Sequence, residues 1–134
     1  MGILSPLLVT RDMKKTIDFY QNTLGFKLGM MFPDVHNPEY ADLSKDSMII
    51  MFTTPTGLKI GRRDKLGVGV NLYLQIDDDI DHYYKELQMN GAKINTAIKD
   101  EPWGSRDFTI EDNNGYLLTF SQTSRTARTQ STGV

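Results

Sequence analysis

Apolar residues recur at helical intervals in two separate stretches of the chain. Spacings of three and four residues place side chains on one face of a helix, so each stretch predicts an amphipathic helix. The apolar positions with this spacing are Met13, Ile17, Tyr20 and Leu24 in the first stretch and Ile80, Tyr84 and Leu87 in the second. Each predicted helix is preceded by one short apolar run and followed by several more.

Both predicted helices carry the same end signals. Asp12 precedes the first helix and Asp78 the second, where a carboxylate accepts hydrogen bonds from the free amide groups of the first turn. Gly25 and Gly91 follow the two helices, at the position where a left-handed residue commonly ends a helix. Because both signals recur at an offset of 66 residues, the pattern indicates that one module is present twice.

The last predicted strands of the two modules also match. Ser47–Thr54 and Gly115–Gln122 align at an offset of 68 residues, and Phe52 then aligns with Phe120. Each module is therefore expected to run strand, helix and three further strands. The predicted strands are Leu4–Val9, Phe26–Phe32, Tyr40–Ser44 and Ser47–Thr54 in the first module, and Asn71–Ile76, Lys93–Ile98, Asp107–Glu111 and Gly115–Gln122 in the second.

Residue alternation separates two faces of these strands, because successive side chains point to opposite sides of a sheet. One face is large and apolar and is expected beneath the helices: Leu8, Ile50, Phe52, Leu72, Leu74, Leu118 and Phe120. The other face is mixed: Ser5, Leu7, Val9, Ile49, Met51, Thr53, Asn71, Tyr73, Gln75, Leu117, Thr119 and Ser121. It lacks the Lys and Glu of a solvated surface, and its amides and hydroxyls disfavour a plain core. We expect this face to line an open cleft.

The amino-acid composition indicates a linker between the two modules and a tail after the second. Residues 55–69 combine Pro, Gly and basic residues, which is typical of a linker. We predict a single α+β domain over residues 1–122, with two βαβββ modules at about 3–54 and 70–122. They form a curved mixed sheet with a central cleft and with helices on the outer face. Residues 123–134 are rich in Ser, Thr, Arg and Gly and are expected to form a flexible tail.

Charge and cysteine content exclude several function classes. The chain has 134 residues, with 15 Lys and Arg against 17 Asp and Glu, and no Cys. The near balance of charge disfavours nucleic acid as a partner, and the lack of Cys excludes disulfides and thiolate catalysis. No apolar run approaches the roughly 20 residues that span a bilayer, and the first ten residues do not resemble a signal peptide. We expect a cytoplasmic protein with no membrane partner.

Two longer motifs resemble one protein superfamily. DMKKTIDFYQNTLGF is similar to the first-helix signature of the glyoxalase, bleomycin-resistance and extradiol dioxygenase proteins, the vicinal oxygen chelate superfamily. EPWGSRDFTIEDNNGYLLTF is similar to its second-half run, in which Trp-Gly precedes a strand and an Asp-x-x-Gly turn precedes the last strand. The resemblance covers about residues 3–122. It implies paired βαβββ modules whose sheets form a cleft, commonly completed by the other module or by a second subunit.

The resemblance also locates the positions at which metal-dependent members bind a divalent cation. These positions correspond to Ser5, Met51, Asn71 and Thr119. None is a His or a carboxylate, which together with thiolate are the donors that divalent metals prefer. We therefore expect no metal in this site and no cofactor.

Other polar residues have structural interpretations that compete with functional ones. His82 and Glu86 stand one helical turn apart, a spacing more typical of a surface pair than of a metal site. His36 and Glu39 lie in a predicted loop that could touch a ligand or a metal, but a solvated loop is the simpler interpretation. The acidic run 77–81 suits helix capping, and residues 112–115 predict a tight turn.

Trp103 is the most informative single residue for function. A ring in a Pro-Trp-Gly loop can stack on a flat ligand or fill the core, and the sequence leaves both open. Arg106 could pair with an anionic ligand group or with a surface carboxylate. Phe32, beside Met30 and Met31, offers apolar surface to a ligand or to a partner module.

No catalytic constellation can be assembled from these residues, so a binding role is favoured over catalysis. By its resemblance to bleomycin-resistance members, the chain is expected to bind a small, partly aromatic molecule without a metal. The predicted ligand-binding residues are Trp103, Tyr73, Asn71, Arg106, Phe32, Met51, Thr119, Ser5 and Gln75.

Two alternative functions stay open. One is a metal-dependent lyase, isomerase or dioxygenase with a displaced ligand set of His36, Glu39 and Asn71. The other is a fold that only mediates association. A homodimer is expected in any case, because open sheet edges need to be covered and the superfamily commonly uses a second copy. Exchanged and side-by-side modules are equally compatible with the sequence.

Overall fold

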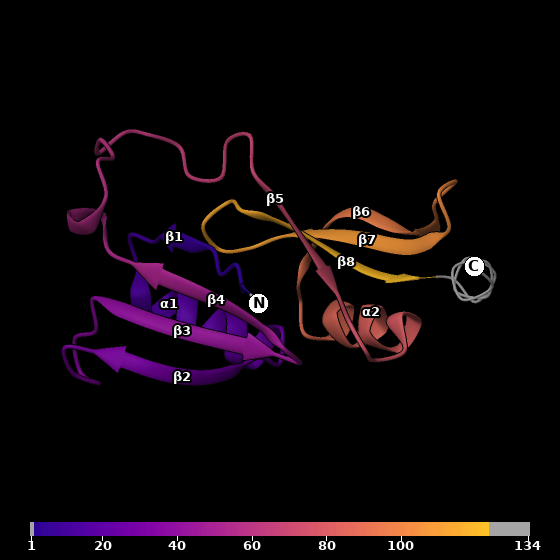
Figure 1. Cartoon of the computed structure of the whole chain (residues 1–134), viewed down its shortest axis with the longest axis horizontal. Coiled ribbons are helices and arrows are strands. Elements are labelled where there is room, and N and C mark those ends of the chain that lie inside the picture. The colour runs from indigo at the N-terminus through magenta and orange to yellow at the C-terminus, as the bar shows by residue number, and fades with distance from the viewer. Residues whose placement is uncertain (1, 124–134) are drawn as a thin grey trace. The chain divides into compact units, whose positions relative to one another are not determined.

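The computed structural model describes residues 2–123, which divide into two compact units. The first unit comprises residues 2–68 together with Asn113–Gly115, and the second comprises residues 69–112 and 116–123. Each unit contains one strand, one helix and three further strands, as the sequence predicts. In each unit the helix lies across one face of a four-stranded mixed sheet (Figure 1). The fold is therefore α+β with two βαβββ modules.

The first unit has its strands in the order β1-β4-β3-β2. Its elements are β1 (Leu7–Val9), α1 (Met13–Asp18) continued by a π-helical turn (Phe19–Thr23), β2 (Lys27–Phe32), β3 (Tyr40–Lys45) and β4 (Met48–Thr53). β1 is parallel to β4, and the other pairs are antiparallel. The Asp12 carboxylate accepts from the amide of Lys15 at 3.0 Å, and Gly25 has a φ of 77°, so both predicted end signals are confirmed.

The predicted first strand is shorter than expected at its N-terminal end. It begins at Leu7 rather than Leu4, and Leu4 is 94% exposed. Pro6 directly precedes the strand and has no amide hydrogen to donate, although its carbonyl accepts from the amide of Met51 at 2.9 Å. Ser5 therefore lies outside the strand and is half-buried.

The second unit repeats this arrangement, with its strands in the order β5-β8-β7-β6. Its elements are β5 (Asn71–Gln75), α2 (Ile80–Met89), β6 (Lys93–Asp100), β7 (Ser105–Glu111) and β8 (Leu117–Thr123). β8 includes Thr123, the first residue of the predicted tail, and residues 124–134 lie outside the described residues. The segment predicted as a linker, residues 55–69, belongs to the first unit up to Val68 and contains a short 3₁₀ turn, Pro55–Gly57.

The second helix begins one residue later than the sequence analysis expected. Its capping residue is Asp79 and not Asp78, because the Asp79 carboxylate accepts from the amides of Asp81 and His82 at 3.0 and 3.2 Å. Ile80, the first residue of the helix, is in the core at 1% exposure. Tyr83 is also buried, at 3% exposure, and the predicted Tyr84 is half-buried and packs against Phe108 with ring centroids 4.9 Å apart.

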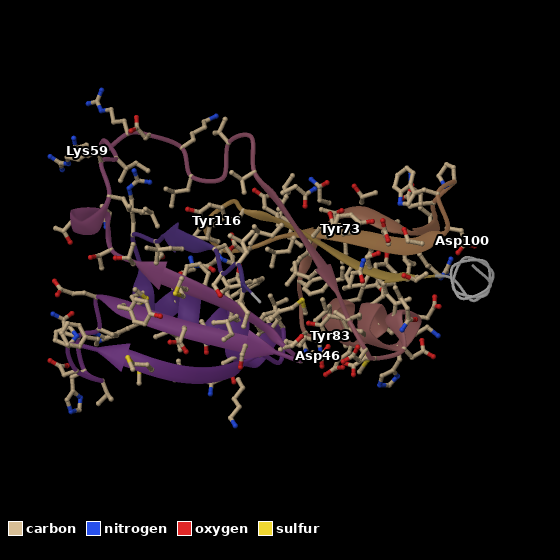
Figure 2. The ribbon with its side chains drawn as sticks, viewed as in Figure 1. Asp46, Lys59, Tyr73, Tyr83, Asp100 and Tyr116 are labelled. Atoms are coloured by element: carbon tan, nitrogen blue, oxygen red, sulfur yellow. The ribbon has the colours of Figure 1, made fainter. Side chains whose placement is uncertain are left out.

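An aromatic contact between helix and last strand occurs in both units. Tyr20 packs edge-on against Phe52 with ring centroids 5.0 Å apart, and Tyr83 packs against Phe120 at 5.1 Å. Both phenylalanines are fully buried, and they are the pair that the sequence alignment of the modules matched. The two cores therefore share a contact as well as a topology. Figure 2 labels Tyr83, which belongs to α2, and Tyr73, which belongs to β5.

The predicted separation of the sheet faces is also found. The apolar face is buried beneath the helices, with Ile50, Phe52, Leu118 and Phe120 between 0 and 2% exposed. On the mixed face, Leu7, Ile49 and Tyr73 are 43, 44 and 52% exposed. No helix within residues 2–123 is long and apolar enough to cross a membrane.

Candidate ligand-binding site

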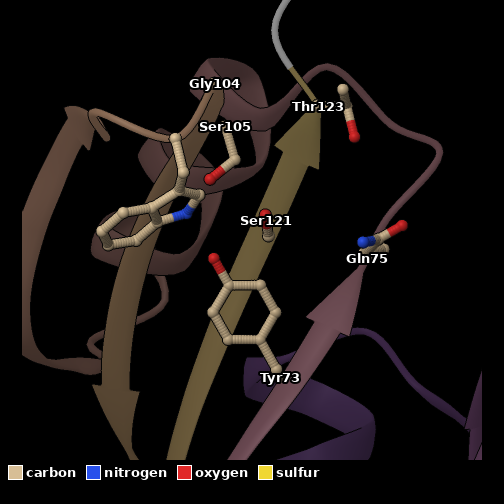
Figure 3. A pocket seen from close by; sticks show the side chains of 7 residues that line it. Tyr73, Gln75, Gly104, Ser105, Ser121 and Thr123 are labelled. Carbon is tan, nitrogen blue, oxygen red and sulfur yellow. The ribbon is translucent and has the colours of Figure 1, made fainter. Parts of the chain in front are cut away.

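A pocket of about 250 Å³ lies on the mixed face of the second sheet. Its lining comes from β5, β7, β8 and the loop between β6 and β7: Tyr73, Gln75, Trp103, Gly104, Ser105, Ser121 and Thr123. Figure 3 shows the Tyr73 ring leaning over strand β8, with its hydroxyl directed toward Ser105 and Ser121. The structure thus brings together three residues of the predicted ligand-binding set: Tyr73, Gln75 and Trp103.

The loop that carries Trp103 is a tight connection between β6 and β7. The amide of Gly104 donates to the carbonyl of Glu101 at 3.1 Å, and the amide of Glu101 donates to the carbonyl of Ser105 at 2.7 Å. Pro102 suits the second position of such a turn, and Gly104 has a φ of 99°, which favours glycine. The turn holds Trp103 at the pocket with 69% of its surface exposed. Of the two uses that the sequence left open, the core is therefore excluded.

A row of hydrogen-bonded polar side chains lies on the same face of the second sheet as the pocket. The Thr119 hydroxyl donates to the amide oxygen of Asn71 at 3.0 Å and shares a hydrogen bond with the Thr109 hydroxyl at 2.8 Å. Because a hydroxyl has one proton, Thr109 is the donor in the second bond. Asn71 and Thr119, both in the predicted set, are thus linked directly to each other.

This row does not fit a divalent metal. The amide oxygen of Asn71 already accepts from Thr119, and a hydroxyl is a poor ligand for a divalent cation. Within residues 2–123, no group of three or more His, Cys, Asp and Glu side chains is placed to hold a metal ion. No step of a reaction can be derived through a metal at these positions.

Arg106 lies apart from the pocket. Its guanidinium holds both oxygens of Asp81 on α2, with Nη2 to Oδ1 at 2.9 Å and Nε to Oδ2 at 3.1 Å, and Nη1 lies 3.3 Å from Asp100. Strand alternation explains this, since Arg106 points away from the face that its neighbours Ser105 and Asp107 occupy. The hydrogen bonds from Arg106 lower the pKa of Asp81. The surface-pair interpretation of Arg106 is the one that the structure supports.

The remaining predicted ligand residues, Ser5, Phe32 and Met51, belong to the first unit. Met51 is half-buried on the mixed face of the first sheet, opposite Leu7 of β1 and Asp42 of β3. Phe32, at the end of β2, is 61% exposed.

Asp42 lies at the β-bulge of that first sheet. Its Oδ1 accepts from the amide of Met30 at 3.2 Å, and its Oδ2 accepts from the Tyr40 hydroxyl at 3.1 Å. Burial raises the pKa of Tyr40, and Asp42 raises it further. Both oxygens of this carboxylate are therefore engaged.

Two loops have structural roles that account for their polar residues. Asp34 accepts from the amides of His36 and Asn37, each at 2.8 Å, and both His36 and Glu39 are exposed, as in a solvated loop. The predicted turn at 112–115 is found, because the Asp112 carboxylate accepts from the amide of Tyr116 at 2.8 Å and Gly115 has a φ of 98°.

The sequence analysis missed Asp107 and Ser105 on β7. Both are buried on the mixed face, at 5 and 9% exposed, and Oδ2 of Asp107 accepts a hydrogen bond from the Tyr73 hydroxyl. A signal was present, since Ser105, Asp107 and Thr109 alternate with Phe108 and Ile110. The predicted strand began only at Asp107, so this alternation was too short to recognise.

The family model of the Glyoxalase/Bleomycin resistance protein/Dioxygenase superfamily matches residues 2–120. No curated protein matches the chain. Solved structures show the same fold. TioX from Micromonospora sp. ML1 is 23% identical with a TM-score of 0.75, over 92% of this chain and 99% of its own.

Two further structures extend the similarity. A glyoxalase/bleomycin resistance protein/dioxygenase from Nocardioides is 20% identical with a TM-score of 0.73, over 93% of this chain and 85% of its own. A virulence protein from Salmonella typhimurium is 20% identical with a TM-score of 0.69, over 92% of this chain and 97% of its own. At these identities the similarity concerns the fold alone.

Proposed function

The chain belongs to the Glyoxalase/Bleomycin resistance protein/Dioxygenase superfamily, and from this premise we propose that it binds a small, partly aromatic molecule without a metal. The observation that carries the proposal is the position of Trp103, which a tight turn holds largely exposed at the edge of a pocket. An exposed Trp of this kind is costly to leave in water and well suited to stacking on a flat ligand. We therefore infer that the chain sequesters such a molecule, as bleomycin-resistance members do, rather than transforming it.

The polar lining supports a ligand with oriented hydrogen-bonding groups. Tyr73, Gln75 and the serines of β7 and β8 surround the pocket, so a ligand that stacks on Trp103 also meets hydroxyl and amide groups. Ligand pockets typically combine apolar contact with a few polar groups that fix orientation. The residues of the first unit in the predicted set, Ser5, Phe32 and Met51, stay part of the proposal as further contacts.

Calorimetry with a neutral aromatic probe tests this function. We expect saturable binding of naphthalenemethanol to the wild-type protein, weakened roughly tenfold in Trp103→Ala because an aromatic contact is worth about 0.5–1.5 kcal/mol beyond its buried area. Met89→Ala is the matched control, since Met89 is an apolar side chain on α2 that is 85% exposed. Equal binding by the two variants would refute the proposal, as would absence of saturable binding both of this probe and of charged probes with the same ring.

We also propose that the protein forms a homodimer. Four large apolar side chains of the first sheet are more than two-fifths exposed: Leu7, Met30, Phe32 and Ile49. Soluble monomers seldom expose so many large apolar side chains on one sheet, so a second copy of the chain is a suitable cover. Sedimentation equilibrium should show a dimer that Phe32→Asp weakens, whereas a wild-type monomer at high concentration would contradict it.

A further inference from the structure

The second sheet carries a buried carboxylate that is only half satisfied. Asp107 is 5% exposed, and its Oδ2 accepts from the Tyr73 hydroxyl. Its Oδ1 is fully buried and has no hydrogen-bond donor among the described residues. The Ser105 hydroxyl, two residues away on the same face, is also buried and has no hydrogen-bond partner within residues 2–123. Two unsatisfied polar groups thus lie side by side along one strand.

Folding alone does not account for this arrangement. A buried carboxylate normally accepts several hydrogen bonds, because an unsatisfied charged oxygen away from water is costly. The same chain solves the problem elsewhere: both oxygens of Asp42 accept hydrogen bonds, although Asp42 is only half-buried. Where a buried acceptor has no donor in the protein, a donor from a ligand is a physical explanation.

Asp107 lies next to the pocket. Three neighbours of Asp107 line the pocket. They are Tyr73, which donates a hydrogen bond to Asp107, Ser105, which lies on the same strand as Asp107, and Ser121, which is paired with Asp107 on β8. In Figure 3 the Tyr73 hydroxyl points to the side where both serines lie. The phenol therefore covers the carboxylate, and because Tyr73 is 52% exposed it has room to turn aside.

The two basic residues nearest to Asp107 in the sheet, Lys99 and Arg106, form ion pairs with other carboxylates. Lys99, the partner of Asp107 on β6, lies with its ammonium 3.9 Å from Glu101. Arg106 holds Asp81 and Asp100 on the other face. In the part of the chain that the structure describes, neither of these cations pairs with Asp107.

We propose that Asp107 is the anchor for a positively charged nitrogen, a protonated amine or amidine, on the aromatic ligand of this pocket. The inference rests on the proposed function and specifies its ligand class. The aromatic part stacks on Trp103, while the cationic nitrogen donates to Oδ1 of Asp107 and lies within reach of the Ser105 hydroxyl, which accepts. Hydrogen bonds between charged partners are about twice as strong as neutral ones, and more so in a partly dry site.

A series of three naphthalene probes with the same ring tests the charge preference by calorimetry. Naphthylmethylamine is cationic, naphthalenemethanol is neutral and naphthoate is anionic. In the wild-type protein we expect the amine to bind roughly tenfold or more tightly than the alcohol, and the anion to bind most weakly. Asp107→Asn keeps an acceptor for Tyr73 but removes the charge, so the amine and the alcohol should then bind alike.

Two further variants serve as a charge control and as a second test of the anchor. Glu86→Gln removes one negative charge from an exposed position on α2 and should leave the preference unchanged. Tyr73→Phe leaves Asp107 without its protein donor, so the preference for the amine should be kept or increased even if Asp107→Asn folds poorly. Equal binding of amine and alcohol in the wild type, or a preference that survives Asp107→Asn, would overturn the anchor alone. If none of the three probes binds, the proposed function itself fails.

Discussion

The open faces of the two sheets differ, although the two modules share a topology and a core contact. In the first sheet the exposed side chains are largely apolar, and its central carboxylate, Asp42, is fully hydrogen-bonded. In the second sheet the face is polar, with the row formed by Asn71, Thr119 and Thr109 and with a carboxylate, Asp107, one of whose oxygens accepts no hydrogen bond from the residues that the structure describes. The second face also holds the pocket at Trp103.

This contrast shows which positions of a duplicated fold stay similar in the two modules and which can differ. The faces beneath the helices remain equivalent. Tyr20 contacts Phe52 in the first module, and Tyr83 contacts Phe120 at the equivalent position of the second. Close packing leaves little choice of residue there. The open faces have no such requirement, and we propose association for the first and ligand binding for the second.

The largest expected effect tests the equivalence of the two cores. Phe52→Ala and Phe120→Ala each remove a fully buried ring, and each should lower the free energy of unfolding by about 3–5 kcal/mol. Urea unfolding of both variants measures this loss. Met89→Ala, at a position that is 85% exposed, serves as the control and should change the stability by less than about 1 kcal/mol. A small effect at Phe52 or Phe120 alone would break the equivalence of the modules.

An intermediate effect is expected for the polar row of the second face. Thr119→Val removes the hydroxyl that links Asn71 to Thr109, and the buried Thr109 loses its acceptor. The cost should be about 1–2 kcal/mol. Thr53→Val is the matched control on the last strand of the first unit, because its hydroxyl makes only a 3.4 Å bond to the next carbonyl. Equal losses for the two variants would remove the distinction between the faces.

The smallest effect concerns the ion pair of Arg106 and Asp81. The pKa of Asp81 is lowered by the hydrogen bonds from Arg106, so its stabilising contribution is present above the ordinary Asp pKa. It is lost as the pH falls through the lower folded value. Because the Asp81 side chain is half exposed, the pair is worth only about 0.2–1 kcal/mol.

Thermal unfolding between neutral and acidic pH measures this contribution. The difference in stability between wild type and Asp81→Asn should shrink as the pH falls. Ligand binding should be the same in both proteins, since the pair lies away from the pocket. A loss of probe binding in Asp81→Asn would contradict this and would indicate that Arg106 contributes to ligand binding.

Much of the architecture follows from local sequence signals. The duplicated end signals, the matched last strands and the apolar face were all predictable, because helix caps and strand alternation act over a few residues. The choice of Asp79 over Asp78 was not, since several adjacent aspartates have the same capping ability. Packing of Ile80 selects among them.

The binding site was only partly predictable. Tyr73, Gln75 and Trp103 were found from alternation and from a turn motif, and all three line the pocket. Asp107 was not, because the hydroxyl that binds its carboxylate belongs to Tyr73, which is far away in sequence and lies on another strand. A charged residue in an isolated strand pattern is normally read as exposed.

Amide NMR spectra of isotopically labelled protein, recorded during a titration with naphthylmethylamine, test the central claim most directly. The account predicts that the largest chemical-shift changes fall on the second sheet, at Tyr73, Gly104, Ser105, Asp107 and Ser121. Amides of the outer helix α2 should change little. Saturable binding whose largest changes lie elsewhere, leaving these five residues unaffected, would contradict the assignment of the ligand site to this face.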